Sequence, residues 1–252
     1  MKMNCSDKNF VHLAAAVVLA VIGFATLASA QVASPRVATV IHVEGKARFS
    51  VDNQTWQPLK TGAVFNLGAV IQTAEKARVD ILLDDAAADL KGGQSGDDQT
   101  ANVVRVLPNA VVAIDKLTAI RYDALQEVQL DVRSGQILGS ARKLTGTAKY
   151  EVKVANGVVG VRGGYFKISS NGMVDVYTGD VVVAESTSDG SLVTKLVGTG
   201  RRFDPATGGL TDAPPLDKKE SSVIKDSRST GTDANGQPQR RVPDINGGFR
   251  KY

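Results

Sequence analysis

The stretch that decides the fold is ANGVVGVRGGYFKISSNGMVDVYTGDVVVAE, residues 155–185. It holds two Asn-Gly pairs, Asn156-Gly157 and Asn171-Gly172, between short runs of valine, isoleucine and aromatic residues. Asn-Gly is a strong signal for a two-residue hairpin turn, because both central residues of a type I′ turn need positive φ. The stretch therefore predicts consecutive β-hairpins, with Arg162 inside an otherwise apolar and glycine-rich run.

Alternation of apolar and polar residues extends the strand pattern outward. The longest alternating run covers residues 41–52, and a shorter one has Val79, Ile81 and Leu83 on its apolar side and Arg78 and Asp80 on its polar side. We expect the apolar members to face a core and the polar members to face water. The apolar side of the longest run consists of Ile41, Val43, Gly45, Ala47, Phe49 and Val51.

A weak internal repeat supports a stack of similar elements. Residues 130–138 and 174–182 share the form apolar-Asp-Val-x-Ser/Thr-Gly-x-apolar-apolar. No long helical stripe is present beyond the apolar run near the N-terminus. Many short strands with turn residues between them predict an all-β fold, with antiparallel strands in a sandwich or roll-like stack.

The ends of the chain have a different composition. Lys2 and Lys8 precede an apolar run over residues 13–27, and Ala28-Ser29-Ala30 matches a cleavage pattern, so residues 1–30 are expected to be a signal peptide. The apolar run is too short for a spanning helix, which needs about 20 residues, although an uncleaved anchor is the alternative. The β domain is expected over residues 31–210 and a disordered tail over 211–252.

These features indicate a mature protein in the periplasm or outside the cell, with no membrane-spanning segment after cleavage. Cys5 is the only cysteine, so the mature chain has no thiol and no disulfide. The formal net charge of +4 is too small and too dispersed to indicate nucleic-acid binding. The glycine-containing segment 85–102 lacks periodicity and is expected to be an exposed loop.

Two separated patterns together resemble the FecR domain, a bacterial extracytoplasmic all-β module. One runs from Gly45 to Asp84 and includes Trp-x-Pro-Leu, and the other holds Val-Arg-Gly before an aromatic strand. Gly164 departs from the family pattern, which has Thr or Ser there. The signal peptide also stands where iron-signalling members carry an anti-sigma segment and a transmembrane helix. The matching residues, interpreted as structural, are Trp56, Pro58, Leu59, Gly62, Gly68, Thr73, Arg162, Gly163, Phe166 and Gly179.

No arrangement of residues predicts catalysis, a metal site or a cofactor. Arg162 has the fork that binds carboxylate or phosphate, but glycines beside it favour a structural role at a strand corner. His42 is the only histidine after the signal peptide, and Trp56 is interpreted as an anchor rather than a sugar platform. The acidic residues Asp84, Asp85, Asp89, Asp97 and Asp98 do not match a calcium-loop spacing.

We therefore expect a non-enzymatic exported protein that acts as a binding or scaffold module of the bacterial envelope through protein–protein contacts, with strand addition at a sheet edge as one mode. The sequence does not specify the partner or the oligomeric state. The alternatives are a polysaccharide-binding or carbohydrate-active surface protein, a structural element of a surface assembly, and an iron-uptake signalling component.

Overall fold

The computed structural model describes residues 34–35, 37–83, 102–120, 124–144, 146–186, 190–217 and 220, together with four short strands near the C-terminus. The chain divides into two compact units, residues 1–32 and 33–252, and every described residue belongs to the second. The predicted signal peptide and nearly all of the predicted loop 85–102 lie outside the described residues.

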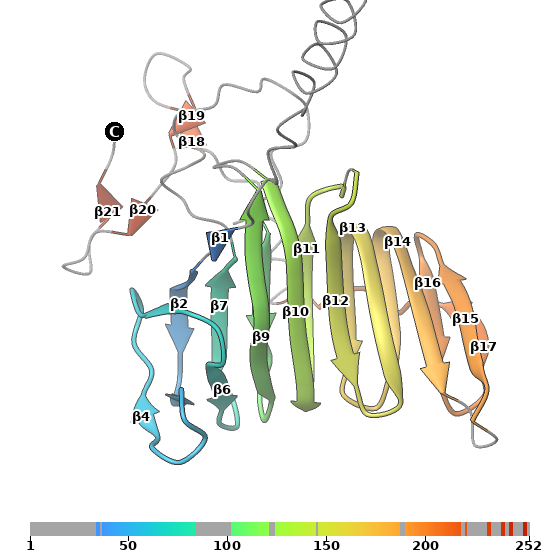
Figure 1. The fold of residues 1–252 in the computed structure, drawn as a ribbon, viewed down its shortest axis with the longest axis horizontal. Helices are drawn as coiled ribbons and strands as arrows, with labels where there is room; N and C mark the ends of the chain where they lie inside the picture. The colour runs from blue at the N-terminus through green and yellow to red at the C-terminus, as the bar shows by residue number, and fades with distance from the viewer. Residues whose placement is uncertain are drawn as a thin grey trace, which may run out of the picture. The chain divides into compact units, whose positions relative to one another are not determined.

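All regular secondary structure in the described residues is β-strand, which confirms the predicted all-β class (Figure 1). The described residues contain no helix long and apolar enough to cross a membrane. The strands are β1 (Ser34–Pro35), β2 (Ala38–Glu44), β3 (Ala47–Ser50), β4 (Gln57–Pro58), β5 (Val64–Phe65), β6 (Val70–Thr73), β7 (Arg78–Leu82), β8 (Val103–Val106), β9 (Val111–Ile120), β10 (Ala124–Ser134), β11 (Gln136–Ala141), β12 (Lys149–Val154), β13 (Gly157–Ser169), β14 (Val174–Ser186), β15 (Leu192–Val197), β16 (Arg201–Asp204), β17 (Gly209–Asp212), β18 (Gly231–Thr232), β19 (Pro238–Gln239), β20 (Val242–Pro243) and β21 (Phe249–Arg250).

Strands β1 to β17 form one continuous sheet that is folded into two layers. The β10 layer follows the order β4, β3, β6, β9, β10, β12, the first part of β13, the second part of β14, and β15. The β11 layer follows the order β5, β2, β7, β8, β11, the second part of β13, the first part of β14, β16 and β17. The β10–β12 pair is parallel, because the chain crosses to the other layer as β11 and returns. The inner faces of both layers form one hydrophobic core.

Glycines with positive φ mark the corners at which the chain crosses between layers. Gly45 separates β2 from β3, and Gly135 separates β10 from β11. The corner of β13 is at Gly163 and Gly164, and the corner of β14 is at Gly179. The internal repeat in the sequence therefore has a structural meaning, because its two glycines, Gly135 at φ 75° and Gly179 at φ 80°, are both corners.

The corner shared by β13 and β14 has no room for a side chain. A Cβ atom on Gly164 would lie 2.0 Å from the carbonyl oxygen of Thr178, and one on Gly179 would lie 2.1 Å from that of Gly163. Gly164 also has φ +103°, a region that residues with a Cβ rarely adopt. Position 164 therefore requires glycine, the residue that departs from the pattern seen in the sequence.

Both predicted hairpins are present, but the predicted position of one turn is wrong by one residue. Val154 pairs with Gly157, so the loop between β12 and β13 is Ala155-Asn156, and Asn156 does not have positive φ. Gly157 is instead required by close packing, since a Cβ there would lie 2.1 Å from the oxygen of Ala184. At the other pair, Gly172 has φ 90° and its N–H donates to the Ser169 oxygen at 2.9 Å.

The run 41–52 also differs from the predicted single strand. It is divided at Gly45, so its two parts belong to different layers. A bulge between Val40 and His42 shifts the alternation, and Val40 is fully buried while Ile41 is half-buried. Val51, which was expected to face the core, is 65% exposed. Alternation alone cannot locate a bulge, because one extra residue reverses the face of all that precede it.

The outer face of the β11 layer is covered rather than open to water. Asp80, expected to be exposed, is buried beside Arg105, whose Nε and Nη2 donate to its two carboxylate oxygens at 2.6 and 2.7 Å. Removing one partner of such a buried pair costs about 3–5 kcal/mol. A small apolar cluster around Val103 and Leu138 lies on the same face.

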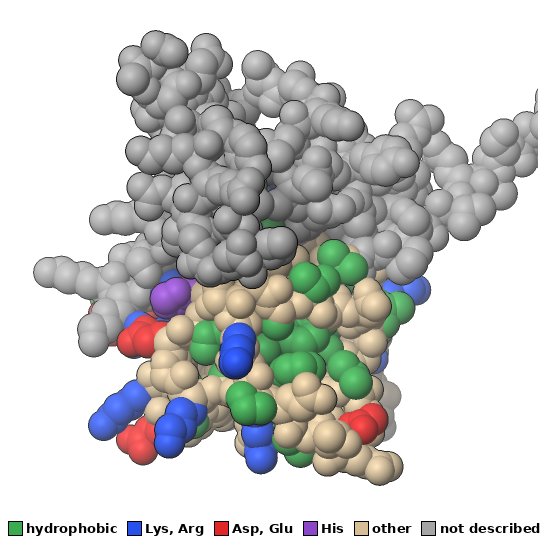
Figure 2. Space-filling model, turned by 90° about the vertical axis from the view of Figure 1, so that its left-hand side faces the viewer, with side chains coloured by type: hydrophobic (Ala, Val, Ile, Leu, Met, Phe, Trp, Pro, Cys, Tyr) green, Lys and Arg blue, Asp and Glu red, His purple; other side chains and the backbone are tan. Residues whose placement is uncertain are grey.

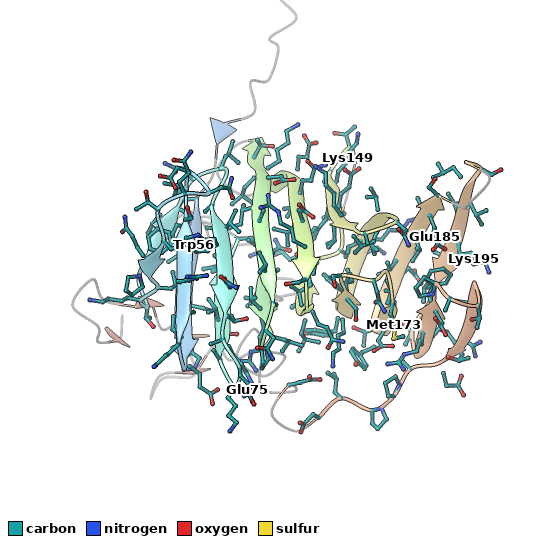
Figure 3. All side chains as sticks on the ribbon, turned by 90° about the horizontal axis from the view of Figure 1, so that it is seen from below. Trp56, Glu75, Lys149, Met173, Glu185 and Lys195 are labelled. Atoms are coloured by element: carbon teal, nitrogen blue, oxygen red, sulfur yellow. The ribbon has the colours of Figure 1, made fainter. Side chains whose placement is uncertain are left out.

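Part of this cover comes from the segment after β17, here called the strap, which comprises residues 213–217 and Glu220. Leu216 and Tyr177 pack against the Val103–Leu138 cluster, and Lys167 donates to Glu220 at 3.0 Å. Figure 3 shows the segment along the outside of the layers. The described structure therefore continues beyond residue 210, where the sequence places the end of the domain.

Substituting the corner glycine tests how much the layer crossing depends on bare backbone. Gly68→Ala, at φ +86° with no atom within 4 Å of the new Cβ, is expected to cost about 1–2 kcal/mol of unfolding free energy through backbone strain alone. Gly164→Ala adds the contact with Thr178 and is expected to cost about 1–3 kcal/mol more. Urea denaturation of both variants measures this difference, and equal losses would show that the corner relaxes freely.

The strap predicts a dependence of stability on alkaline pH. Burial raises the pKa of Tyr177 to about 12, and the carboxylates of Asp175 and Glu220 contribute to the rise. Because the folded pKa lies above the unfolded value of about 10, this contribution is present below pH 10 and is lost as the pH rises to 12. The wild type should lose more unfolding free energy over this interval than Tyr177→Phe, and parallel losses would contradict the burial of the phenol.

Candidate functional site

The first group of family-pattern residues forms one end of the two layers and holds it together. Leu59 is buried and its N–H donates to the Ala47 oxygen at 2.9 Å. The Thr73 hydroxyl donates to the Leu107 oxygen at 2.6 Å and accepts from the Ala110 N–H at 3.0 Å. These contacts link neighbouring strands, and a small hollow of about 300 Å³ lies beside Ala47 and Thr73.

The remaining residues of this group lie at the surface of the same end. Gly62 and Gly68 both have φ 86°, and their N–H groups donate to the carbonyl oxygens of Val40 and Ile114, each at 2.8 Å. Trp56 is half-buried, with the Arg48 guanidinium 4.6 Å from its ring centroid, and Pro58 is exposed in β4. Figure 2 shows hydrophobic side chains gathered on this end, and Figure 3 places Trp56 at the opposite end from Lys195. Large apolar residues exposed in this region are Val51, Val64 and Leu67.

The second group lies at the β13–β14 corner and separates into buried and exposed members. Phe166 is fully buried, with its ring edge-on to Tyr150 at 5.8 Å between centroids. Gly163 and Gly179 form the corner itself. Arg162 is the extra residue of a bulge between Val161 and Gly163, and its side chain is exposed. Among the described residues, no hydrogen bond or ion pair holds its guanidinium.

A hollow of about 770 Å³ opens beside this corner. Its cationic lining consists of Lys143, which follows β11, Lys149 at the start of β12, and Arg162, and all three side chains are exposed. Glu151 and Asp180 are its acidic members. The sequence analysis did not single out the two lysines, because their convergence depends on the crossing of β13 between layers.

An apolar stripe continues from the hollow across the outer face of the β10 layer. Glu151 pairs with Gly160, Gly160 with Val182, and Val182 with Leu196, which makes one row across β12, β13, β14 and β15. A Cβ on Gly160 would meet only the Val182 oxygen, at 3.7 Å, so the row is hollowed at this glycine. The outer stripe, as named here, comprises Val158, Val182, Ala184, Leu192 and Leu196.

The outer stripe ends at β15, which pairs with β14 and has no other strand beside it among the described residues. Leu192 is 70% exposed, Leu196 57% and Val193 41%. The sequence LVTKLV carries apolar residues on both faces of this strand, and this pattern is visible in the sequence alone. An apolar strand with an unpaired edge is the form in which sheets accept another strand.

The described residues show no arrangement for metal binding. They contain no group of three or more His, Cys, Asp or Glu residues placed to hold a metal ion. His42 is exposed on β2, apart from the hollow. The acidic residues 84, 85, 89, 97 and 98 lie outside the described residues.

Comparisons with known proteins give little further information. No family model matches the chain, and no curated protein matches it. One solved structure that resembles it is the crystal structure of a candidate anti-sigma factor from Parabacteroides distasonis ATCC 8503. The TM-score is 0.35 and the sequence identity 13%, over 66% of this chain and 69% of the other. A likeness of this degree supports no conclusion about function.

The exposed position of Arg162 predicts that its side chain contributes little to stability, whereas a structural role would predict a large contribution. Because its side chain is exposed and has no partner among the described residues, Arg162→Gln should change the melting temperature by less than about 2 °C, since surface substitutions stay within about 0.5 kcal/mol. Phe166→Ala, from the same strand, should unfold the protein at a much lower temperature because it empties a core position. Differential scanning calorimetry separates the cases, and a large loss for Arg162→Gln would restore the structural interpretation.

Proposed function

We propose that this chain is a non-enzymatic, exported binding module of the bacterial envelope, with a FecR-like β domain that docks a protein partner by strand addition along β15. The observation that carries the proposal is the edge of β15 that no other described strand pairs with, together with the exposure of Leu192, Val193 and Leu196. Natural sheets protect their edges with charges, bulges or covering segments, and β15 has one charged residue, Lys195, beside three exposed large apolar ones.

The geometry of β15 suits an extended ligand. Six residues of β15 pair with β14 without a register shift, so the strand is regular along its length. A partner strand would gain main-chain hydrogen bonds from the edge and side-chain contacts from the outer stripe. Leu192 and Leu196 lie on the same face as the stripe, because successive side chains of a strand alternate.

Export is supported by the sequence alone. The basic start, the short apolar run and the Ala-Ser-Ala site are typical of a secretory signal, and no cysteine follows Cys5. The order of Trp-x-Pro-Leu, glycines and Val-Arg-Gly resembles FecR domains, which lie outside the cytoplasm. The proposed partner is therefore a protein of the same compartment.

Photo-crosslinking at matched positions tests the docking edge. A photoreactive residue is placed at Leu196 or at Val64, which are both 57% exposed and lie on strands at opposite ends of the layers. In the envelope of the source bacterium, position 196 should form a covalent adduct with one protein, and position 64 should not.

Two outcomes would contradict the proposal. Identical adducts from positions 196 and 64 would show non-specific contact, and the absence of any adduct at position 196 would contradict the docking edge. An adduct between two copies of the chain would favour the surface-assembly alternative instead.

A further inference from the structure

We propose that the hollow beside the β13–β14 corner binds an acidic segment of the protein that docks on β15. This inference rests on the proposed function, because it assigns the segment to the same partner. It adds the chemistry of that partner, which is a run of carboxylates next to an extended apolar strand.

The shape of the hollow suits a peptide chain. Its volume of about 770 Å³ is in the range of ligand sites. Gly146 and Gly160 contribute to its lining, and a Cβ atom at Gly146 would meet no atom within 4 Å while one at Gly160 would meet only the Val182 oxygen, at 3.7 Å. These two glycines let another main chain approach closely, which larger side chains there would hinder.

The charges of the hollow favour an anion. The cations of Lys143, Lys149 and Arg162 have no hydrogen bond or ion pair among the described residues. Three cations thus face two carboxylates in the lining, Glu151, which accepts a hydrogen bond from Gln129 Nε2 at 3.2 Å, and Asp180. The bulge at Arg162 redirects its side chain relative to a regular strand, as bulges beside binding sites do. Its planar fork suits carboxylate oxygens.

Continuity with the docking edge favours a protein segment over a polysaccharide. The row from Glu151 through Gly160 and Val182 reaches Leu196 on β15, so one ligand can contact both places. The tyrosines that line the hollow, Tyr150 and Tyr165, are only 2% and 4% exposed. Their ring faces are therefore not available for stacking on a sugar.

The experiment measures binding of poly-L-glutamate to the full chain by isothermal titration calorimetry. The variant Lys143→Gln, Lys149→Gln, Arg162→Gln should weaken binding about tenfold and reduce its salt dependence, because three exposed charge contacts are lost. The matched control is Lys46→Gln, Lys60→Gln, Lys76→Gln, which removes the same charge from exposed lysines near the other end. The control should bind as the wild type does.

Each alternative result is decisive. Equal weakening of poly-L-glutamate binding in both triple variants would show that binding depends on net charge and not on the hollow, which would overturn the inference. A wild type that does not bind poly-L-glutamate would overturn it as well. Equal or tighter binding of polygalacturonate or of inorganic phosphate would overturn the assignment to a peptide. The double variant Leu192→Gln, Leu196→Gln should keep poly-L-glutamate binding, so failure of the docking edge and failure of the hollow give different results.

Discussion

The tightest packing in this fold is the contact of backbone with backbone where β13 and β14 pass between the two layers. Gly164 and Gly179 lie against the carbonyl groups of Thr178 and Gly163 at distances that leave no space for a Cβ atom. Because both strands continue through this corner, each belongs to both layers. The core, the hollow and the outer stripe all take their positions from this crossing.

The outer face of the β10 layer changes character on the two sides of the hollow. Two ion pairs lie over β9, β10 and β12, with Lys116 2.7 Å from Glu127 and Lys153 2.9 Å from Asp115. Hydrogen bonding to Asp115 raises the pKa of Lys153. Such surface pairs add about 0–1 kcal/mol each to stability. Beyond β12 the face becomes apolar, and the unpaired cations lie at the boundary.

The sequence was sufficient for the class of the fold and for the corner at Gly163 and Gly164, but it assigned Gly157 to a turn. Alternation identified Val79, Ile81 and Leu83 as core residues, and all three are buried. The position of the bulge near Ile41 and the burial of Asp80 could not be obtained in this way, because both depend on residues far away in the chain. Asp80 is buried because β8 places Arg105 beside it.

The candidate site was less accessible to sequence reasoning than the fold. Arg162 stood out, but its glycine neighbours indicated a structural corner and gave no sign that the side chain is exposed. Lys143 and Lys149 join it only because the segment between β11 and β12 returns to the corner. Whether β15 lies at an edge depends on where the next strand goes, and β16 pairs with the other layer.

The regular ladder between β14 and β15 also determines how the docking edge would bear a mechanical load. The six paired positions from Leu192 to Val197 lie along one line. A force parallel to β15 would load all of the hydrogen bonds between β14 and β15 at once, whereas a force directed away from the sheet would break them one after another. A partner held along this strand would therefore resist force along its own axis far better than force across it.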